Sequence, residues 1–328
     1  MTLPTLIFRG IISFLILAAV PHIFAYGADF GILESSNFLN RIWEDSAVEY
    51  WFNVVNESSL FYIIIPFFIV ELVRYTVLRR LNWDIIGDSI ANVVTLFAFL
   101  AIEVVLALLF IYQLYFWIYE NVSLPHLPLN IITIISCVLL ADFAYYWDHR
   151  VMHRIGIGWA THTVHHSSPH FNMSVAYRFG PLDAIFPILF SLPIVMLGFN
   201  PWLLLAAELF VQTYQVILHT EIIPKLPKPI EFIMNTPSHH RVHHGVNRQY
   251  WDKNYGGIFI IWDRLFGTFE EEVEKVRFGV TKPINSNNPL KVFFHGFTRL
   301  FRKISHVKGI RNKLLCLIKP PDWKPNEI

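Results

Sequence analysis

The chain has 328 residues, of which 54% are hydrophobic, 16% are aromatic and 16% are charged, and its formal net charge is +1. A soluble domain carries about 25% charged residues, so this composition indicates a membrane protein, and the small net charge gives no reason to expect nucleic-acid binding. Two cysteines cannot build a disulfide framework, whereas eleven of the fifteen histidines fall between residues 149 and 244.

Six apolar stretches approach the length of about 20 residues that a helix needs to cross a bilayer. The first follows Arg9 and is either a span or a cleaved signal peptide. The fifth contains three prolines and is expected to be kinked or re-entrant. The sequence therefore predicts an all-helical, multi-span fold. The six stretches cover residues 8–26, 58–78, 90–118, 127–147, 181–199 and 201–218.

Basic residues predict how these stretches cross the membrane, because lysine and arginine favour the cytoplasmic side. Arg79 and Arg80 follow the second stretch, and acidic residues between 44 and 57 precede it. The second stretch is thus expected to end in the cytoplasm, and the fourth to return there. This orientation places all the histidine clusters in a polar cap on the cytoplasmic side.

Three regions follow from this pattern. Residues 1–57 are expected to form a hydrophobic segment and a non-cytoplasmic loop, and residues 58–285 the catalytic membrane domain. Residues 286–328 form a basic cytoplasmic tail that either touches anionic lipid head groups or is simply solvated.

Three histidine clusters lie in the membrane domain. The first has the pattern His-x-x-x-His, and the second and third both have His-x-x-His-His. Residues three and four apart share one helix face, so each cluster can present its imidazoles to one metal ion. Eight imidazoles exceed the needs of one tetrahedral zinc site and suit two metal ions, with iron, copper, zinc and nickel all compatible. The predicted ligands are His149, His153, His162, His165, His166, His240, His243 and His244.

Two further histidines and two carboxylates lie close to these clusters in the sequence. His219 ends the last apolar stretch and is predicted to be a ligand, while His239 either binds metal or braces a ligand. Asp142 and Glu208 lie inside apolar stretches, in helical register with histidines. They are predicted either to hydrogen-bond to ligand imidazoles or to join neighbouring helices.

The sequence around the clusters resembles the fatty acid hydroxylase/sterol desaturase superfamily and, within it, the alkylglycerol monooxygenases and their bacterial relatives. This resemblance implies two iron ions, O2 and a lipid substrate. It also implies an external reductant, which is either a tetrahydropterin or a cytochrome or ferredoxin-type donor. Arg154 departs from the animal enzymes, which carry an acidic residue after the first cluster. The resembling segments are 142–153, 159–168, 235–245, 252–257, 261–269 and 279–285.

The expected function is hydroxylation of a lipid C–H bond, with the carbon next to the ether oxygen of a glyceryl ether as one target. Sterol or fatty-acid hydroxylation or desaturation remains an alternative within the same superfamily. A metal-binding or transport protein is an alternative outside it, although its histidines should line several spans, whereas these gather at the ends of spans. An intramembrane zinc peptidase would show His-Glu-x-x-His, which the sequence lacks.

Overall fold

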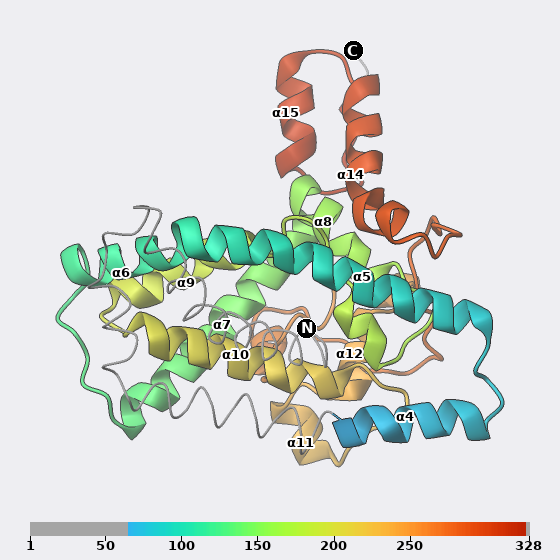
Figure 1. Ribbon diagram of the computed structural model, residues 1–328, viewed down its shortest axis with the longest axis horizontal. Helices are drawn as coiled ribbons and strands as arrows, with labels where there is room; N and C mark the ends of the chain where they lie inside the picture. Colours follow the sequence, from blue (N-terminus) through green and yellow to red (C-terminus); the bar gives the residue numbers. More distant parts are fainter. Residues whose placement is uncertain (1–64, 326–328) are drawn as a thin grey trace, which may run out of the picture.

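The computed structural model describes residues 65–325, and its regular elements in that range are helices, with two isolated β-bridges (Figure 1). The prediction of an all-helical fold is confirmed. The longer elements are α4 (Ile65–Val77), α5 (Trp83–Leu106), the π-helix η3 (Ala107–Ile111), α6 (Tyr112–Asn121), α7 (Ile131–Arg154), α8 (Gly156–His166), α9 (Phe186–Met196), α10 (Pro201–Leu218), α14 (Pro289–His306) and α15 (Ile310–Ile318). The shorter ones are η4 (Met173–Tyr177), α11 (Lys228–Ile233), α12 (Pro237–His243), η5 (Arg248–Tyr250) and α13 (Ile261–Leu265).

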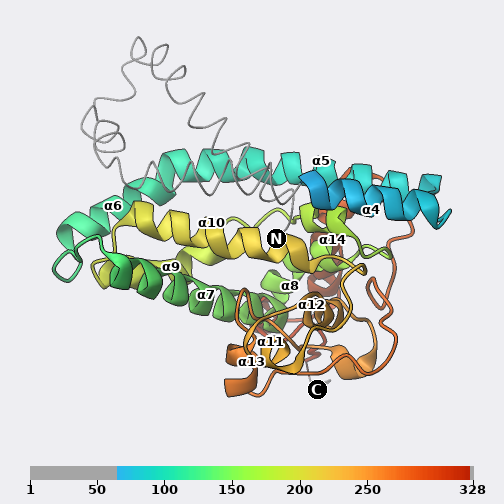
Figure 2. The ribbon, with the colours of Figure 1, turned by 90° about the horizontal axis from the view of Figure 1, so that it is seen from below.

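Three helices in the described range are long and apolar enough to cross a membrane. The first is continuous over Trp83–Asn121, where η3 joins α5 to α6, and its 39 residues make it longer than a bilayer requires. The other two are α7, with 24 residues, and α10, with 18 residues. α5 and α10 follow the long axis of the molecule in both views (Figures 1 and 2), and α7 packs against α10.

The other predicted stretches differ from spans or fall outside the described range. Residues 181–199 contain only α9, whose 11 residues are too few to cross a bilayer. Pro193 lies inside this short helix, and Pro187 lies in its first turn. Of the stretch 58–78, the structure describes α4, with 13 residues, and the stretch 8–26 lies outside the described residues.

Asparagine side chains begin three of these helices. Asn130 accepts hydrogen bonds from the second and third amides of α7. Asn288 caps α14 in the same way, Asn200 accepts from the second amide of α10 alone, and each is followed by a proline at the first helical position. Proline has no amide hydrogen to leave unpaired there, so Asn-Pro fixes the start of a helix.

The apolar side chains divide between a packed interior and an exposed surface. α6, α7, α9 and α10 share a core in which Cys137, Val195 and Leu204 are fully buried. On the outer faces of α5 and α7, Phe97, Ile131 and Ile132 are 58%, 67% and 74% exposed. Apolar surface of this kind is stable in contact with lipid chains, as expected for membrane spans.

The loop at residues 122–129 joins α6 to α7 at the end of the molecule away from α8 and α12 (Figure 1). We expect a tag in this loop to lie outside the cell membrane and a tag at residues 271–275 to lie in the cytoplasm, because of the distribution of basic residues. Labelling with a membrane-impermeant reagent in intact and opened cells checks both positions. If the two tags respond alike, the predicted orientation is wrong.

Candidate metal centre

Nine buried histidines form two groups, and within each group the potential ligand nitrogens lie within 4.8 Å of one another. The five-histidine group consists of His149, His153, His162, His166 and His243. The four-histidine group consists of His165, His219, His240 and His244. The structure therefore brings together all eight histidines of the three clusters, and it adds His219 to them.

The helices explain how neighbouring residues reach different groups. α7 supplies two histidines to the five-histidine group, and the residue after α10 supplies His219 to the four-histidine group. α8 contributes to both groups, because successive residues project about 100° apart around a helix. His165 and His166 therefore point to different groups, as do His243 and His244 at the end of α12. The repeated His-x-x-His-His pattern thus places two sites side by side.

Backbone carbonyls fix the protonation of four of these rings. A carbonyl oxygen only accepts hydrogen bonds, so an Nδ1 atom facing one must carry a proton, which leaves the Nε2 lone pair free. Such partners commonly orient metal-binding imidazoles. The four contacts run from His149 Nδ1 to Tyr255 O at 3.0 Å, His165 Nδ1 to Arg178 O at 3.2 Å, His219 Nδ1 to Gln215 O at 3.1 Å and His243 Nδ1 to Lys253 O at 2.9 Å.

The free lone pairs face each other at short distances. His165 and His219 both carry their protons on Nδ1, yet their Nε2 atoms lie only 3.2 Å apart. Two facing lone pairs repel unless a cation lies between them. Ligands at right angles around a metal, with bonds of about 2.1 Å, would lie about 3.0 Å apart. The other Nε2 to Nε2 distances are 3.0 Å for His149 and His162, 3.1 Å for His153 and His166, and 2.9 Å for His219 and His240. The residues present therefore fit metal ions.

Burial favours the metal-binding form of these imidazoles. Desolvation lowers the pKa of His162, His166 and His240 well below the usual 6.5, and the neighbouring histidines lower it further. The same direction and first cause apply to the pKa of His165, His219, His243 and His244. Neutral imidazole is the form that binds metal.

The metal-free protein is expected to lose stability as the pH falls below about 6.5. The folded state holds these histidines at lowered pKa values, so below this pH the unfolded chain binds more protons than the folded chain. Acid therefore favours unfolding, and stability is regained as the pH rises. The unfolding temperature of metal-stripped protein, measured between about pH 7 and pH 5, should fall steadily. A flat profile would contradict the neutral state of the buried rings.

His239 lies outside both groups. Its Nε2 lies 2.9 Å from Glu231 Oε2, and its ring packs edge-on against Phe269. Burial raises the pKa of Glu231, but hydrogen bonds from His239 and from the amide of Leu226 outweigh it and lower the pKa to about 2. An ionised Glu231 thus holds His239 in the first turn of α12, directly before His240.

Among residues 65–325, Asp142 hydrogen-bonds to no imidazole, contrary to the first of its two predicted roles. Its carboxylate accepts hydrogen bonds from the amides of Ile258 and Phe259 and from the indole of Trp262, at 2.5, 3.2 and 2.8 Å. Seven residues separate it from His149, or about 10 Å along a helix, which is beyond the reach of a carboxylate. Asp142 instead holds the segment after Tyr255, whose carbonyl orients His149.

Glu208 faces a cavity instead of the histidines. It accepts a hydrogen bond from Ser191 and, with Asp148 and Gln212, lines a cavity of about 30 Å³ between α7, α9 and α10. No histidine lines this cavity. The hydrogen bond from Ser191 to Glu208 joins α10 to α9, which is the second of the two roles predicted for Glu208.

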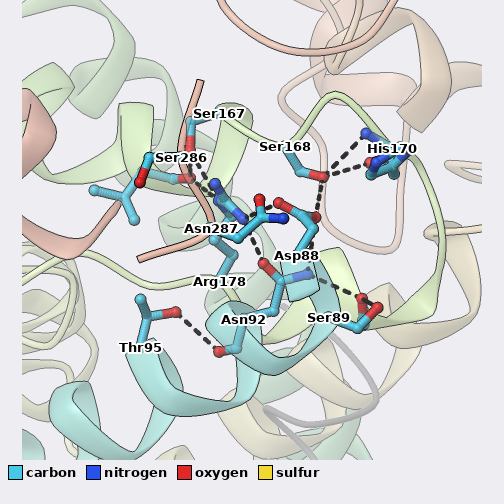
Figure 3. Close-up of polar contacts among 12 residues, drawn as sticks. Asp88, Ser89, Asn92, Thr95, Ser167, Ser168, His170, Arg178, Ser286 and Asn287 are labelled. Atoms are coloured by element: carbon cyan, nitrogen blue, oxygen red, sulfur yellow. Dashed lines mark hydrogen bonds and ion pairs between the residues drawn. The ribbon is translucent and has the colours of Figure 1, made fainter. Parts of the chain in front are cut away.

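Arg178 is a buried residue near the site that the sequence patterns did not single out. It is 1% exposed and donates hydrogen bonds to Asp88 at 2.7 Å and Asn92 at 2.6 Å on α5, and to Ser167 at 2.8 Å after α8 (Figure 3). Its carbonyl accepts from His165. The ion pair thus joins α5 to the residue that orients a ligand. The sequence feature that could have identified Arg178 is its position between two aromatic residues, shortly before the apolar stretch 181–199.

Comparison with known proteins identifies this arrangement. The fatty acid hydroxylase family model matches residues 134–268, which contain all nine grouped histidines. Human alkylglycerol monooxygenase is 45% identical over 215 residues, which cover 65% of this chain and 48% of that protein. Residues 134–268 belong to the fatty acid hydroxylase superfamily. The resemblance inferred from the sequence is thereby confirmed.

Two other curated proteins match shorter parts of the chain at lower identity. Ornithine lipid hydroxylase OlsE of Rhizobium tropici is 30% identical over 133 residues, 40% of each chain. Human lathosterol oxidase is 26% identical over 148 residues, which cover 43% of this chain and 46% of that protein. The chain spans about half the length of the curated relatives it matches. No solved structure matches it significantly.

Proposed function

We propose that this chain is a membrane di-iron monooxygenase that uses O2 to hydroxylate a lipid C–H bond. The observation that carries the proposal is the pair of buried, all-histidine groups. Imidazole accepts several transition metals, and membership of the fatty acid hydroxylase superfamily favours iron. Two bound iron ions would supply the activation of O2.

The chain itself would position the metal ions and exclude water from them. Backbone carbonyls keep the Nε2 lone pairs of four imidazoles available, so no proton has to leave those atoms when metal binds. Phe171 stacks on Phe278 with ring centres 4.6 Å apart and lies against His219 and His244, at 5.6 and 5.2 Å. This aromatic pair covers the four-histidine group and would shield it from water.

We propose a glyceryl ether as the substrate. The support is the 45% identity to human alkylglycerol monooxygenase, over an alignment that covers 48% of that protein. A site where spans end suits a lipid whose polar head stays at the interface. One oxygen atom would enter the C–H bond next to the ether oxygen, while two electrons and two protons reduce the other oxygen atom to water. The resulting hemiacetal separates into a fatty aldehyde and glycerol.

The assay supplies iron-loaded protein in membranes with an alkylglycerol, O2 and either tetrahydropterin or a reduced ferredoxin. Fatty aldehyde formed with tetrahydropterin supports both the proposed substrate and tetrahydropterin as the reductant. An equal yield of aldehyde with ferredoxin alone would support the substrate but show that tetrahydropterin is not required. If a fatty acid or sterol is hydroxylated and no aldehyde forms from the alkylglycerol, the substrate is that lipid class and not a glyceryl ether. No oxidation of any of these lipids with either reductant would contradict the proposed activity.

A further inference from the structure

The last two helices form a hairpin with an unusual orientation. α14 and α15 stand crosswise to α5 and α10 in Figure 1. Both helices pack against α8, which carries three of the grouped histidines and begins two residues after the span α7 ends. Helices that run crosswise to membrane spans lie along the plane of the membrane. The hairpin therefore lies beside the end of α7, which is one of the three candidate spans.

Two glycines fix the hairpin to α8 at close range. A Cβ atom added to Gly296 of α14 would overlap the carbonyl oxygen of Ala160, and one added to Gly156 would overlap the carbonyl oxygen of Cys316 on α15. Backbone approaches this close require glycine. The hairpin and the histidine-bearing helix are thus in direct backbone contact at two points.

The hairpin is the most basic part of the chain. Residues 289–319 contain eight lysines and arginines and no aspartate or glutamate, although the whole chain has a net charge of only +1. The remainder of the chain is therefore net acidic. Basic segments next to membrane spans are attracted to anionic lipid head groups.

Each helix of the hairpin also exposes an apolar stripe. On α14, Leu290, Phe294 and Phe301 are 69%, 48% and 63% exposed. Their spacings of four and seven residues put them on one face, which is distinct from the buried face of Val292, Gly296 and Leu300. On α15, Ile310, Leu314 and Ile318 recur every four residues and are 73%, 56% and 61% exposed. Within the described residues, no other protein segment covers these stripes.

We propose that the α14–α15 hairpin rests on the membrane surface and binds anionic lipids. The two apolar stripes would enter the boundary between head groups and acyl chains, while the basic side chains reach the lipid phosphates. A solvated tail would leave both stripes in water, and an acidic partner protein would match the charge but not the stripes. Because the hairpin packs closely on α8, its contact with the lipid would fix the distance of the histidine groups from the head groups. This inference does not depend on the proposed reaction.

The test measures the depth of spin labels on full-length protein in nanodiscs that hold one chain each. Buried Cys137 and Cys316 are replaced by alanine, and single cysteines are introduced by Phe294→Cys or Leu314→Cys. Matched controls are His306→Cys, on the basic side of α14, and Glu274→Cys, in an exposed loop. In discs of phosphatidylcholine and phosphatidylglycerol, we expect the labels at 294 and 314 to collide more with O2 than with a water-soluble nickel chelate. The two controls should show the reverse.

A charge-neutralised variant tests the role of the lipid phosphates. Changing Arg302, Lys308, Arg311 and Lys313 to glutamine should make the depth at 294 and 314 independent of phosphatidylglycerol, whereas the unchanged hairpin should rise toward water when that lipid is omitted. Nickel accessibility at 294 and 314 equal to that at 274 would place the hairpin in water and overturn the proposal. Shielding from both reagents in every lipid mixture would show that protein covers the stripes, and would also overturn it.

Discussion

Replacing His240 with glutamine is expected to lower lipid oxidation by at least about 100-fold, since loss of even an outer partner of a metal ligand costs 10–100-fold. The change removes one of only four imidazoles in the four-histidine group. Iron content should fall from two ions per chain toward one, because the five-histidine group keeps all its ligands. Elemental analysis and the rate of product formation, measured on the same preparation, check both effects.

The adjacent residue provides a matched control. His239 contacts Glu231 instead of the histidine groups, so His239→Gln should keep two iron ions per chain, and glutamine can still donate to that carboxylate. The two variants change the same residue type on the same short helix. If His239→Gln loses iron while His240→Gln retains it, the assignment of ligands at α12 is reversed.

The second large effect is expected on stability. Arg178→Met should lower the free energy of unfolding by about 3–5 kcal/mol, because it leaves the carboxylate of Asp88 buried without its ionic partner. Asp88 and Arg178 are each 1% exposed and their charged atoms lie 2.7 Å apart. Denaturant unfolding in detergent or lipid discs measures the loss.

A second substitution separates the ion pair from simple packing. Adding Asp88→Asn to Arg178→Met removes the unpaired charge, so the double variant should be more stable than Arg178→Met alone. Asp88→Asn alone is also measured. If Asp88→Asn lowers the free energy of unfolding equally with Arg178 present and in the Arg178→Met variant, the two residues do not interact and the proposed coupling is wrong.

Local spacing was sufficient to predict the long apolar helices and to single out the eight clustered histidines, but it did not predict that the second and third clusters each divide between the two groups. The predicted stretch 201–218 corresponds to α10 residue for residue, and the His-x-x-His-His patterns depend only on helical geometry. His219 and His239 could not be distinguished in the same way. Their directions depend on how the chain turns after α10 and before α12, and such turns are set by tertiary contacts.

Long-range pairing explains what the sequence did not show. Arg178 and Asp88 are 90 positions apart, and only the packing of α5 against η4 brings them together. Asp142 shares a helical stripe with His149, but its partners come from residues 258–262, more than 110 positions away. Periodicity identifies the face on which a side chain lies, whereas the partner on that face depends on the completed fold.

The metal content of the full-length protein, purified without O2 and with iron supplied, tests the two-metal centre most directly. Nine buried histidines in two groups predict close to two iron ions per chain. One iron ion per chain, or zinc in place of iron in a protein that oxidises no lipid, would contradict it.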